Sequence, residues 1–146
     1  MTERLVSKSM STRFVLNLLL DASILEAACL MTKTNSSSVL IFDTTGQMRG
    51  IVTERDLMTK VLAKALDPKT TTVSQVMTPN PQCVGPDTTV SEAILIMIER
   101  GFRHLPIKSK DGHITGVFSS SDALPKEIDV AMTMAEFHRQ AFDSKV

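Results

Sequence analysis

The chain has 146 residues, 42% of them apolar, and its 16 basic residues balance its 16 acidic ones. This length fits one domain or two small units sharing a core, and the apolar content argues against wholesale disorder. Zero net charge provides no overall field to hold nucleic acid or an anionic membrane. The absence of Trp and Tyr also disfavours a nucleic-acid surface built from stacked aromatic rings.

The sequence predicts neither a membrane span nor a disulfide framework. The most apolar run, residues 14–20, is much shorter than the roughly 20 residues that a spanning helix needs. Cys29 and Cys83 form no C-x-x-C motif, which suits a reducing compartment, so we expect a cytoplasmic protein. Both are expected to be core cysteines. Residues 1–13 predict a disordered or docking terminus, with a mitochondrial or other organelle-targeting segment as the alternative.

The sequence is duplicated with an offset of 66 residues. When residues 18–58 are placed on 84–124 without a gap, eight of 41 positions are identical, where chance would give about two or three. With one further residue of shift, "VSKSMS" (6–11) lies beside "VSQVMT" (73–78). We assign a first repeat to 6–66, a linker to 67–72, a second repeat to 73–130 and a helical tail to 131–146.

Both copies predict the order β-α-β-β-α. In the first copy we expect an extended segment at 15–20, a helix from Ser23 to Asn35, strands at 39–42 and 50–52, and a last helix from Thr53 to about Leu66. In the second copy the same elements are expected at 82–84, from Thr89 to Gly101, at 105–107, at 116–118 and from Ser119. Capping boxes and left-handed cap residues set the helix ends. Neither copy is large enough to bury a core alone, so we expect an α/β fold in which two pseudo-symmetric repeats pack as one compact module.

One motif occurs in both copies, as "GIVTERD" (50–56) and "GVFSSSD" (116–122). A glycine opens a strand, two apolar residues follow, and a hydroxyl residue then precedes an Asp by three positions. The hydroxyl would lie at a helix N-terminus, where backbone N–H groups favour an anion such as phosphate. The Asp carboxylate, one turn later, can accept hydrogen bonds from the two vicinal hydroxyls of a ribose. The alternative is that each motif is only a helix-capping box.

The repeated unit resembles the cystathionine β-synthase (CBS) domain, and the tandem resembles a CBS pair, or Bateman module. The resemblance covers about residues 6–130, and its signatures are "VMTPNP" (76–81), "GFRHLPI" (101–107) and the two motifs above. It implies a non-catalytic regulatory module that dimerises. It also implies that AMP, ADP, ATP or S-adenosylmethionine binds in a cleft between the copies, without any prosthetic group.

The resemblance further implies a ligand site by position. Asp56 and Asp122 would hold ribose hydroxyls, and Thr53 and Ser119 would contact phosphate or ribose. The remaining positions are Arg103 and His104 near the phosphates, Thr78 and the backbone of Cys83 and Val84 beside the adenine, and Ile41 and Ile107 as apolar walls. Arg55 and Ser121, at variable positions within the two motifs, complete the predicted ligand-binding residues.

The two copies differ around these motifs. Where the second copy has Arg103 and His104, the first has Ser37 and Ser38. We therefore expect the site at Asp122 to be more electropositive and better suited to a phosphorylated ligand. The site at Asp56 would be weaker, different in preference or vacant.

The tail after Pro125 predicts an amphipathic helix with one apolar stripe formed by Ile128, Met132, Ala135 and Phe142. This stripe would pack on its own domain or form a dimer or partner surface. No group of His, Cys or acidic residues has metal-ligand spacing.

These observations predict an adenosine-nucleotide sensor that regulates an unidentified partner protein in trans, because the residues outside the repeats are too few for an effector domain. One alternative is a dimerisation scaffold whose motifs act only as caps. The other is a thiol-based enzyme that uses Cys29 or Cys83, although neither cysteine has a base nearby in the sequence.

Overall fold

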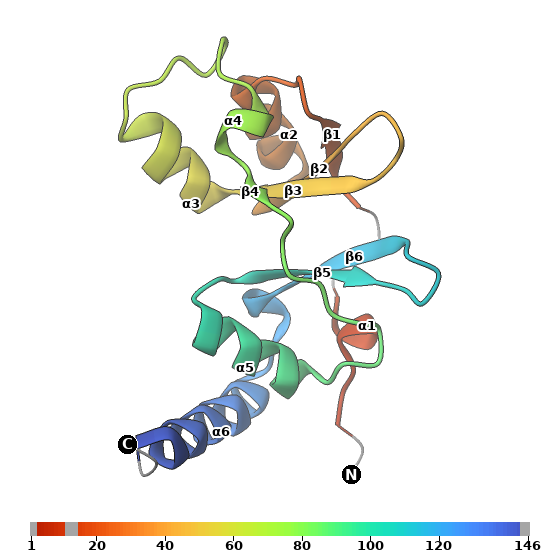
Figure 1. Cartoon of the computed structure of the whole chain (residues 1–146), viewed down its shortest axis with the longest axis vertical. Coiled ribbons are helices and arrows are strands. Elements are labelled where there is room, and N and C mark those ends of the chain that lie inside the picture. Colours follow the sequence, from red (N-terminus) through yellow and green to blue (C-terminus); the bar gives the residue numbers. More distant parts are fainter. Residues whose placement is uncertain (1–2, 11–14, 144–146) are drawn as a thin grey trace. The chain divides into compact units, whose positions relative to one another are not determined.

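The computed structural model describes residues 3–10 and 15–143. The chain divides into two compact units (Figure 1). Val15–Pro81 is called the first unit here, and the described parts of Met1–Phe14 and Gln82–Val146 together are called the second unit.

The first unit is built on a four-stranded sheet in the order β1-β2-β3-β4, in which β1 is parallel to β2 and the other pairs are antiparallel. The apolar face of α2 packs against this sheet through Ile24, Ala27 and Met31, which meet Val39 and Val52 in one core. The elements in chain order are β1 (Asn17–Leu19), α2 (Ile24–Thr34), β2 (Ser38–Phe42), β3 (Met48–Thr53), α3 (Glu54–Asp56), the π-helical turn η1 (Leu57–Leu62), α4 (Val73–Val76) and β4 (Thr78–Pro79).

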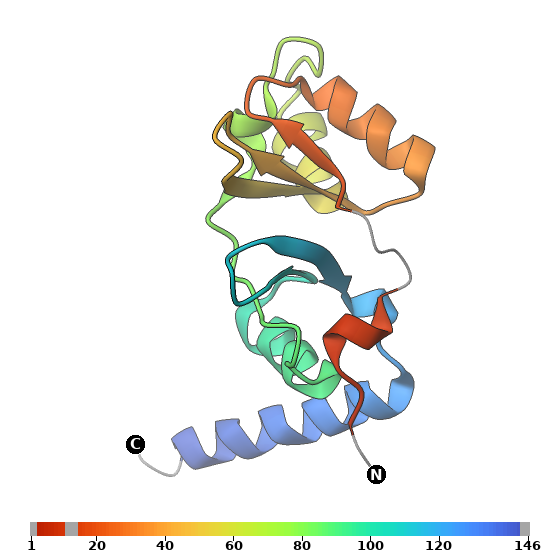
Figure 2. The ribbon, with the colours of Figure 1, turned by 90° about the vertical axis from the view of Figure 1, so that its right-hand side faces the viewer.

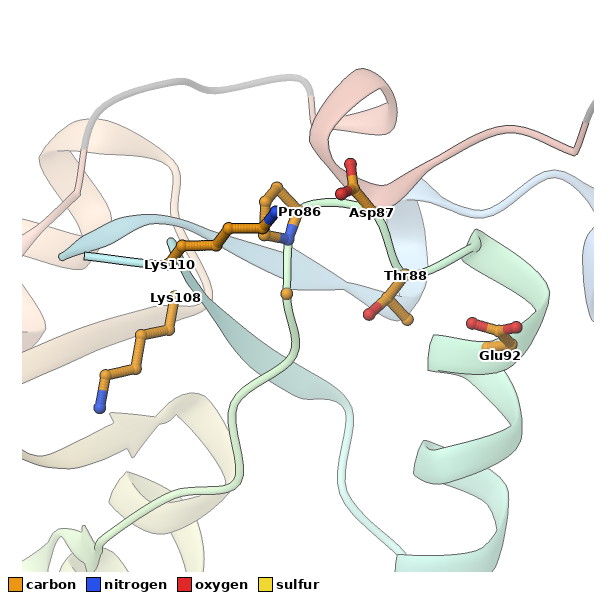
Figure 3. Close-up of a pocket in the computed structure, with 7 residues that line it drawn as sticks. Pro86, Asp87, Thr88, Glu92, Lys108 and Lys110 are labelled. Carbon is orange, nitrogen blue, oxygen red and sulfur yellow. The ribbon is translucent and has the colours of Figure 1, made fainter. Parts of the chain in front are cut away.

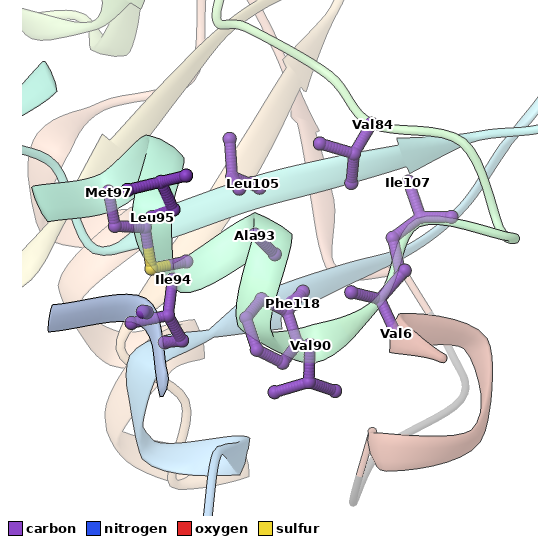
Figure 4. Close-up of a cluster of buried hydrophobic side chains, with 11 residues drawn as sticks. Val6, Val84, Val90, Ala93, Ile94, Leu95, Met97, Leu105, Ile107 and Phe118 are labelled. Atoms are coloured by element: carbon purple, nitrogen blue, oxygen red, sulfur yellow. The ribbon is translucent and has the colours of Figure 1, made fainter. Parts of the chain in front are cut away.

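The second unit repeats this plan with a smaller sheet. β5 and β6 form an antiparallel hairpin, and Val84 bridges Ile107 in parallel, as β1 does β2 in the first unit. Phe118, Leu105 and Ile94 belong to its core (Figure 4). The elements in chain order are α1 (Val6–Ser9), α5 (Val90–Arg100), β5 (His104–Lys108), β6 (Ile114–Ser119), the 3-10 turn η2 (Ser120–Asp122) and α6 (Pro125–Asp143).

The long helices begin and end where the sequence predicts. Ser23 Oγ accepts a hydrogen bond from Glu26 N at 3.1 Å, Ser23 N donates to the Glu26 carboxylate at 2.8 Å, and the equivalent pair in α5 makes the same box. Both helices end at a left-handed residue, Asn35 with φ 53° and Gly101 with φ 79°. The predicted α/β class and β-α-β-β-α order are confirmed.

Two short helices are exchanged between the sequence copies. α1, from the start of the first copy, packs against α5 in the second unit, where Val6 is 0% exposed (Figure 2). α4, from the start of the second copy, lies in the first unit, where Val73 is also 0% exposed. Val6 N donates to Thr88 O at 2.9 Å, and Val73 N donates to Ala22 O at 2.8 Å. The exchange is therefore reciprocal, and the compact units are offset from the sequence repeats.

Of the two alternatives expected for the N-terminus, residues 3–10 dock and are not disordered, because Val6 is part of a core and its neighbours are hydrogen-bonded. Val90 N donates to Arg4 O at 2.9 Å, next to the bond that Val6 makes. The other residues of that expected terminus, 1–2 and 11–13, lie outside the described residues.

The segments after the two motifs depart from the expected helices. In the first copy the helix changes to the π-helical turn η1 and ends at Leu62 rather than about Leu66, and Ala65 takes a left-handed φ of 53°. In the second copy η2 stops at Asp122, because Ala123 is extended with ψ 147°. α6 then runs without a break through the expected boundary between residues 130 and 131.

α6 packs on α5 through two of the four residues of the stripe that the sequence predicts. Ala131 is fully buried, and Ile128 and Ala135 pack beside it. The prediction is wrong for Met132 and Phe142, since they are 58% and 70% exposed. Met132 lies on another side of the helix. Phe142 lies on the packed side of α6, one turn beyond His138. His138 Nδ1 already contacts the Glu99 carboxylate in the last turn of α5, at 2.9 Å. α5 therefore does not extend beneath Phe142. Residues 144–146 of the tail lie outside the described residues.

We predict that Gly50→Ala destabilises the protein more than the matched change Gly116→Ala. A Cβ at Gly50 would lie 2.9 Å from the backbone oxygen of Thr78, which the sheet holds in place. A Cβ at Gly116 would meet only the flexible end of Met10, at 2.7 Å from its Sδ. Overpacking against a fixed atom costs about 1–3 kcal/mol.

Urea unfolding followed by circular dichroism measures both variants. An equal or larger loss of unfolding free energy for Gly116→Ala would contradict this account of the two strands.

Candidate functional site

The first motif forms a closed hydrogen-bonded cap at the end of β3. Thr53 N and Thr53 Oγ1 both donate to Asp56 Oδ2, at 2.9 and 3.1 Å. Asp56 N in turn donates to Thr53 Oγ1 at 3.3 Å. Asp56 is only 8% exposed, whereas Arg55, the variable residue beside it, is exposed. The capping alternative for this motif is therefore realised in the structure, and the carboxylate is held in a fixed orientation.

Lys60 completes the first motif, and the sequence pattern did not predict it. Its ammonium lies 3.1 Å from Asp56 Oδ1 and also donates to the backbone oxygen of Val76 at 3.1 Å. The available signal was the four-residue spacing between Asp56 and Lys60, which places opposite charges on one helix face. Lys60 thereby connects the motif to the end of α4.

The second motif lies at one end of the β5–β6 hairpin, together with the basic residues predicted to accompany it. Ser119 N donates to Asp122 Oδ2 at 2.9 Å, and Ser119 pairs with His104 across the hairpin. Ser120 N donates to Arg103 O at 3.0 Å, so the backbone of the basic pair is joined directly to the motif. The predicted residue Ser121 contacts Ser119 Oγ through its own hydroxyl at 3.2 Å.

A second cation at this motif comes from the N-terminal segment. Arg4 donates through Nη2 to the backbone oxygen of Asp122 at 2.9 Å and to Glu127 Oε1 at 2.7 Å. The hydrogen bond from Arg4 lowers the pKa of Glu127 below its ordinary value, and the same bond raises the pKa of Arg4. Nothing in the sequence pattern pairs residues so far apart, and Arg4 falls in the segment expected to be a disordered or docking terminus.

The remaining predicted site residues lie along β5, on β4 and in the two hydrophobic cores. In the second unit Val84 N donates to Pro106 O at 3.0 Å, which places Cys83 and Val84 along β5. In the first unit Thr78 is exposed and pairs with β3. Ile41 and Ile107 are fully buried in the two cores, so neither presents apolar surface to a ligand in this structure.

The two cysteines differ from the expectation that both lie in cores. Cys29 is exposed, because it lies on the opposite side of α2 from the buried Ala27 and Met31. Cys83 is half-buried, and this burial raises the pKa of its thiol.

Among residues 3–10 and 15–143 no group of three or more His, Cys, Asp or Glu side chains is arranged to hold a metal ion. None of the described helices is both long and apolar enough to cross a membrane.

A surface pocket of about 370 Å³ lies in the second unit (Figure 3). It joins the loop before α5 to the end of β5, and it contains two lysines and two acidic residues. Its lining consists of Gly85, Pro86, Asp87, Thr88, Glu92, Lys108 and Lys110. No predicted site residue lines it, and its labelled side chains point in several directions (Figure 3).

Comparison with known families identifies the family to which this duplicated sequence belongs. The sequence profile of the CBS domain matches the chain twice, at residues 6–63 and 73–127. The chain belongs to the CBS domain family. Its two copies are CBS domains in tandem, and CBS-domain proteins of this type are generally regulatory.

Relatives support the same assignment over most of the chain. A CBS domain-containing protein of Arabidopsis thaliana, CBSCBSPB5, is 35% identical over 120 residues, covering 79% of this chain and 22% of the relative. The chain thus spans about a fifth of that relative's length. A CBS-domain containing protein from Agrobacterium tumefaciens has 27% identity and a TM-score of 0.76, covering 88% of this chain and 94% of that one.

A CBS domain protein from Pyrobaculum aerophilum has the same fold, with a TM-score of 0.78 and 22% identity. The match covers 90% of this CBS chain and 99% of that one, and that structure is complexed with AMP.

We predict that Glu127→Gln removes a pH-dependent contribution to stability. The pKa of Glu127 is lowered in the folded state, so the bond with Arg4 stabilises fully above the ordinary glutamate pKa of 4.5. This contribution is lost as the pH falls through the lower folded-state pKa. The difference in unfolding free energy between wild type and variant should be largest near neutrality and shrink in acid.

Urea unfolding at several pH values measures that difference, and Asp129→Asn, at an exposed acid on the same helix, is the control. A pH-independent difference would contradict the role given to the bond between Arg4 and Glu127.

We predict that alkylation distinguishes the two thiols. At neutral pH, iodoacetamide should modify the exposed Cys29 before Cys83, whose raised pKa leaves less of the reactive thiolate. Mass spectrometry of timed samples gives both rates. Faster modification of Cys83 than of Cys29 would show that the half-buried position is not protective.

Proposed function

We propose that this CBS pair is a non-catalytic regulatory module that binds an adenosine nucleotide, namely AMP, ADP or ATP, or S-adenosylmethionine. The main support is the second motif, where Ser119 and Asp122 lie at the same hairpin end as Arg103 and His104. The AMP bound to the Pyrobaculum aerophilum protein of the same fold adds support for this ligand class.

The chemistry of the second motif suits a nucleoside phosphate. The Asp122 carboxylate is an acceptor for the vicinal hydroxyls of a ribose, and its orientation is fixed by the bond from Ser119 N. Arg103 is exposed and adjoins the motif, and its guanidinium can form a forked pair with phosphate. In this proposal His104, across the hairpin from Ser119, lies beside the same phosphate.

Regulation would act on a partner protein in trans, and the module itself would be a homodimer. A nucleotide shifts a conformational equilibrium only by the difference between its affinities for the two states. The partner must therefore prefer either the nucleotide-bound or the nucleotide-free state of the module. Cys83, whose raised pKa keeps the thiol protonated, gives little support to a thiol enzyme.

A scaffold function is the second candidate, and one observation favours it. Both motifs make capping boxes within the chain itself, since Asp56 and Asp122 each accept a hydrogen bond from the backbone N–H three residues earlier. A cap alone would account for these residues at the start of a helical turn.

We predict that AMP, ADP or ATP raises the melting temperature of the wild-type protein and that Asp122→Ala abolishes most of this rise. A ligand present at about 100 times its Kd stabilises the native state by about 2.7 kcal/mol. Dye-based melting or calorimetry suits this chain, which has no Trp.

Asp129→Ala, at an exposed acid on α6, is the matched control and should keep the full rise. Each variant is compared with its own melting temperature without ligand, because the loss of a cap lowers stability by itself. The absence of any shift with the three nucleotides and S-adenosylmethionine would favour the scaffold.

A further inference from the structure

The Asp56 carboxylate in the first motif is bonded at both oxygens. Oδ2 accepts from Thr53 N and from Thr53 Oγ1, and Oδ1 lies 3.1 Å from the Lys60 ammonium. A ribose would have to place a hydroxyl on a carboxylate oxygen that still has a lone pair to accept it. An oxygen has two lone pairs, so Oδ2 is already saturated and Oδ1 is shared with a cation.

The bond from Lys60 is the one that a ribose hydroxyl would have to displace or share. It is charge-assisted, and such bonds are roughly twice as strong as the bond that a neutral hydroxyl would make in its place. The Asp56 side chain is 11% exposed and that of Lys60 is 40% exposed, so water screens this pair less than it would an ion pair in which both side chains lie in solvent. The exchange of lysine for a hydroxyl is therefore unfavourable at this carboxylate.

Lys60 is held in this position from two directions. Lys60 lies within η1, the wide π-helical turn that follows the first motif. In this turn Ala63 N donates a hydrogen bond to Met58 O at 2.9 Å. The ammonium also donates to the backbone oxygen of Val76, a buried residue at the end of α4. Lys60 therefore has a second partner that keeps it near Asp56.

The second copy has the same residue at the same offset but not the same arrangement. Lys126 follows Asp122 by four residues, as Lys60 follows Asp56. Ala123 is extended, and a new helix begins only at Pro125, so the helical spacing between the two charges is lost. Lys126 is exposed to solvent.

We infer that Lys60 closes the first motif to nucleotide, so that the chain binds one adenosine nucleotide, at the Asp122 motif. This inference rests on the proposed function and assigns Lys60 as the residue that determines which of the two copies binds. Asp56 in this arrangement is a structural cap tied to α4.

Calorimetric titration of the full chain with AMP at pH 8 tests the inference. We expect wild type to bind one AMP per chain, and Asp122→Ala to lose it. Lys60→Met should bind two, and the double variant with both changes should bind one, at least about tenfold more tightly than Asp122→Ala alone. Lys64→Met, at an exposed lysine in the turn after η1, should behave as wild type.

Lys60→Arg provides a second check, because it keeps the charge and should keep one AMP per chain. Circular dichroism of each variant confirms that the fold is retained. Two AMP per wild-type chain, a single site lost in Asp56→Ala instead of Asp122→Ala, or an unchanged Lys60→Met would overturn the inference while leaving nucleotide binding established. No binding to any variant would instead reject the proposed function and this inference with it.

Discussion

Each core of this protein depends on a short helix supplied by the other sequence copy. Val6 and Val73 are both fully buried, and each donates its backbone N–H to the segment just before a long helix of its unit. These bonds fix where α2 and α5 begin and therefore where the strands that carry the two motifs can pack. Withdrawing either short helix from its unit would leave a cavity at the position of its valine, beside a helix N-terminus. It would also break the backbone hydrogen bond of that valine, so that both apolar contact and a hydrogen bond would be lost.

Most of the local structure could be predicted from the sequence, because it depends on residues close together in the chain. The capping boxes and the left-handed ends at Asn35 and Gly101 follow from side-chain chemistry within one turn. The exchange of α1 and α4 could not be predicted, since a buried valine does not reveal which core receives it. The same limit applies to the pair between Arg4 and Glu127, which depends on that exchange.

The candidate site was predictable in its residue types but not in their pairing. The sequence pattern identified Thr53, Asp56, Ser119 and Asp122. It left open whether each Asp carboxylate caps a helix or contacts a ribose, because both roles use the same carboxylate. The pattern did not identify Lys60. On an ordinary surface helix, a lysine four residues after an Asp has a solvated side chain. The partner of Lys60 beyond Asp56 is a backbone oxygen on α4, and only the folded chain brings it near.

The reciprocal exchange of α1 and α4 bears on how such a chain could arise. A single copy would lack the valine that completes its own core unless it obtained one from a second molecule. Two identical single-copy chains could each lend their first helix to the other, which describes a domain-swapped dimer. Joining the two genes end to end would preserve every one of those contacts. It would also free the two copies to diverge, as the lysine-paired and arginine-flanked motifs of this protein have done.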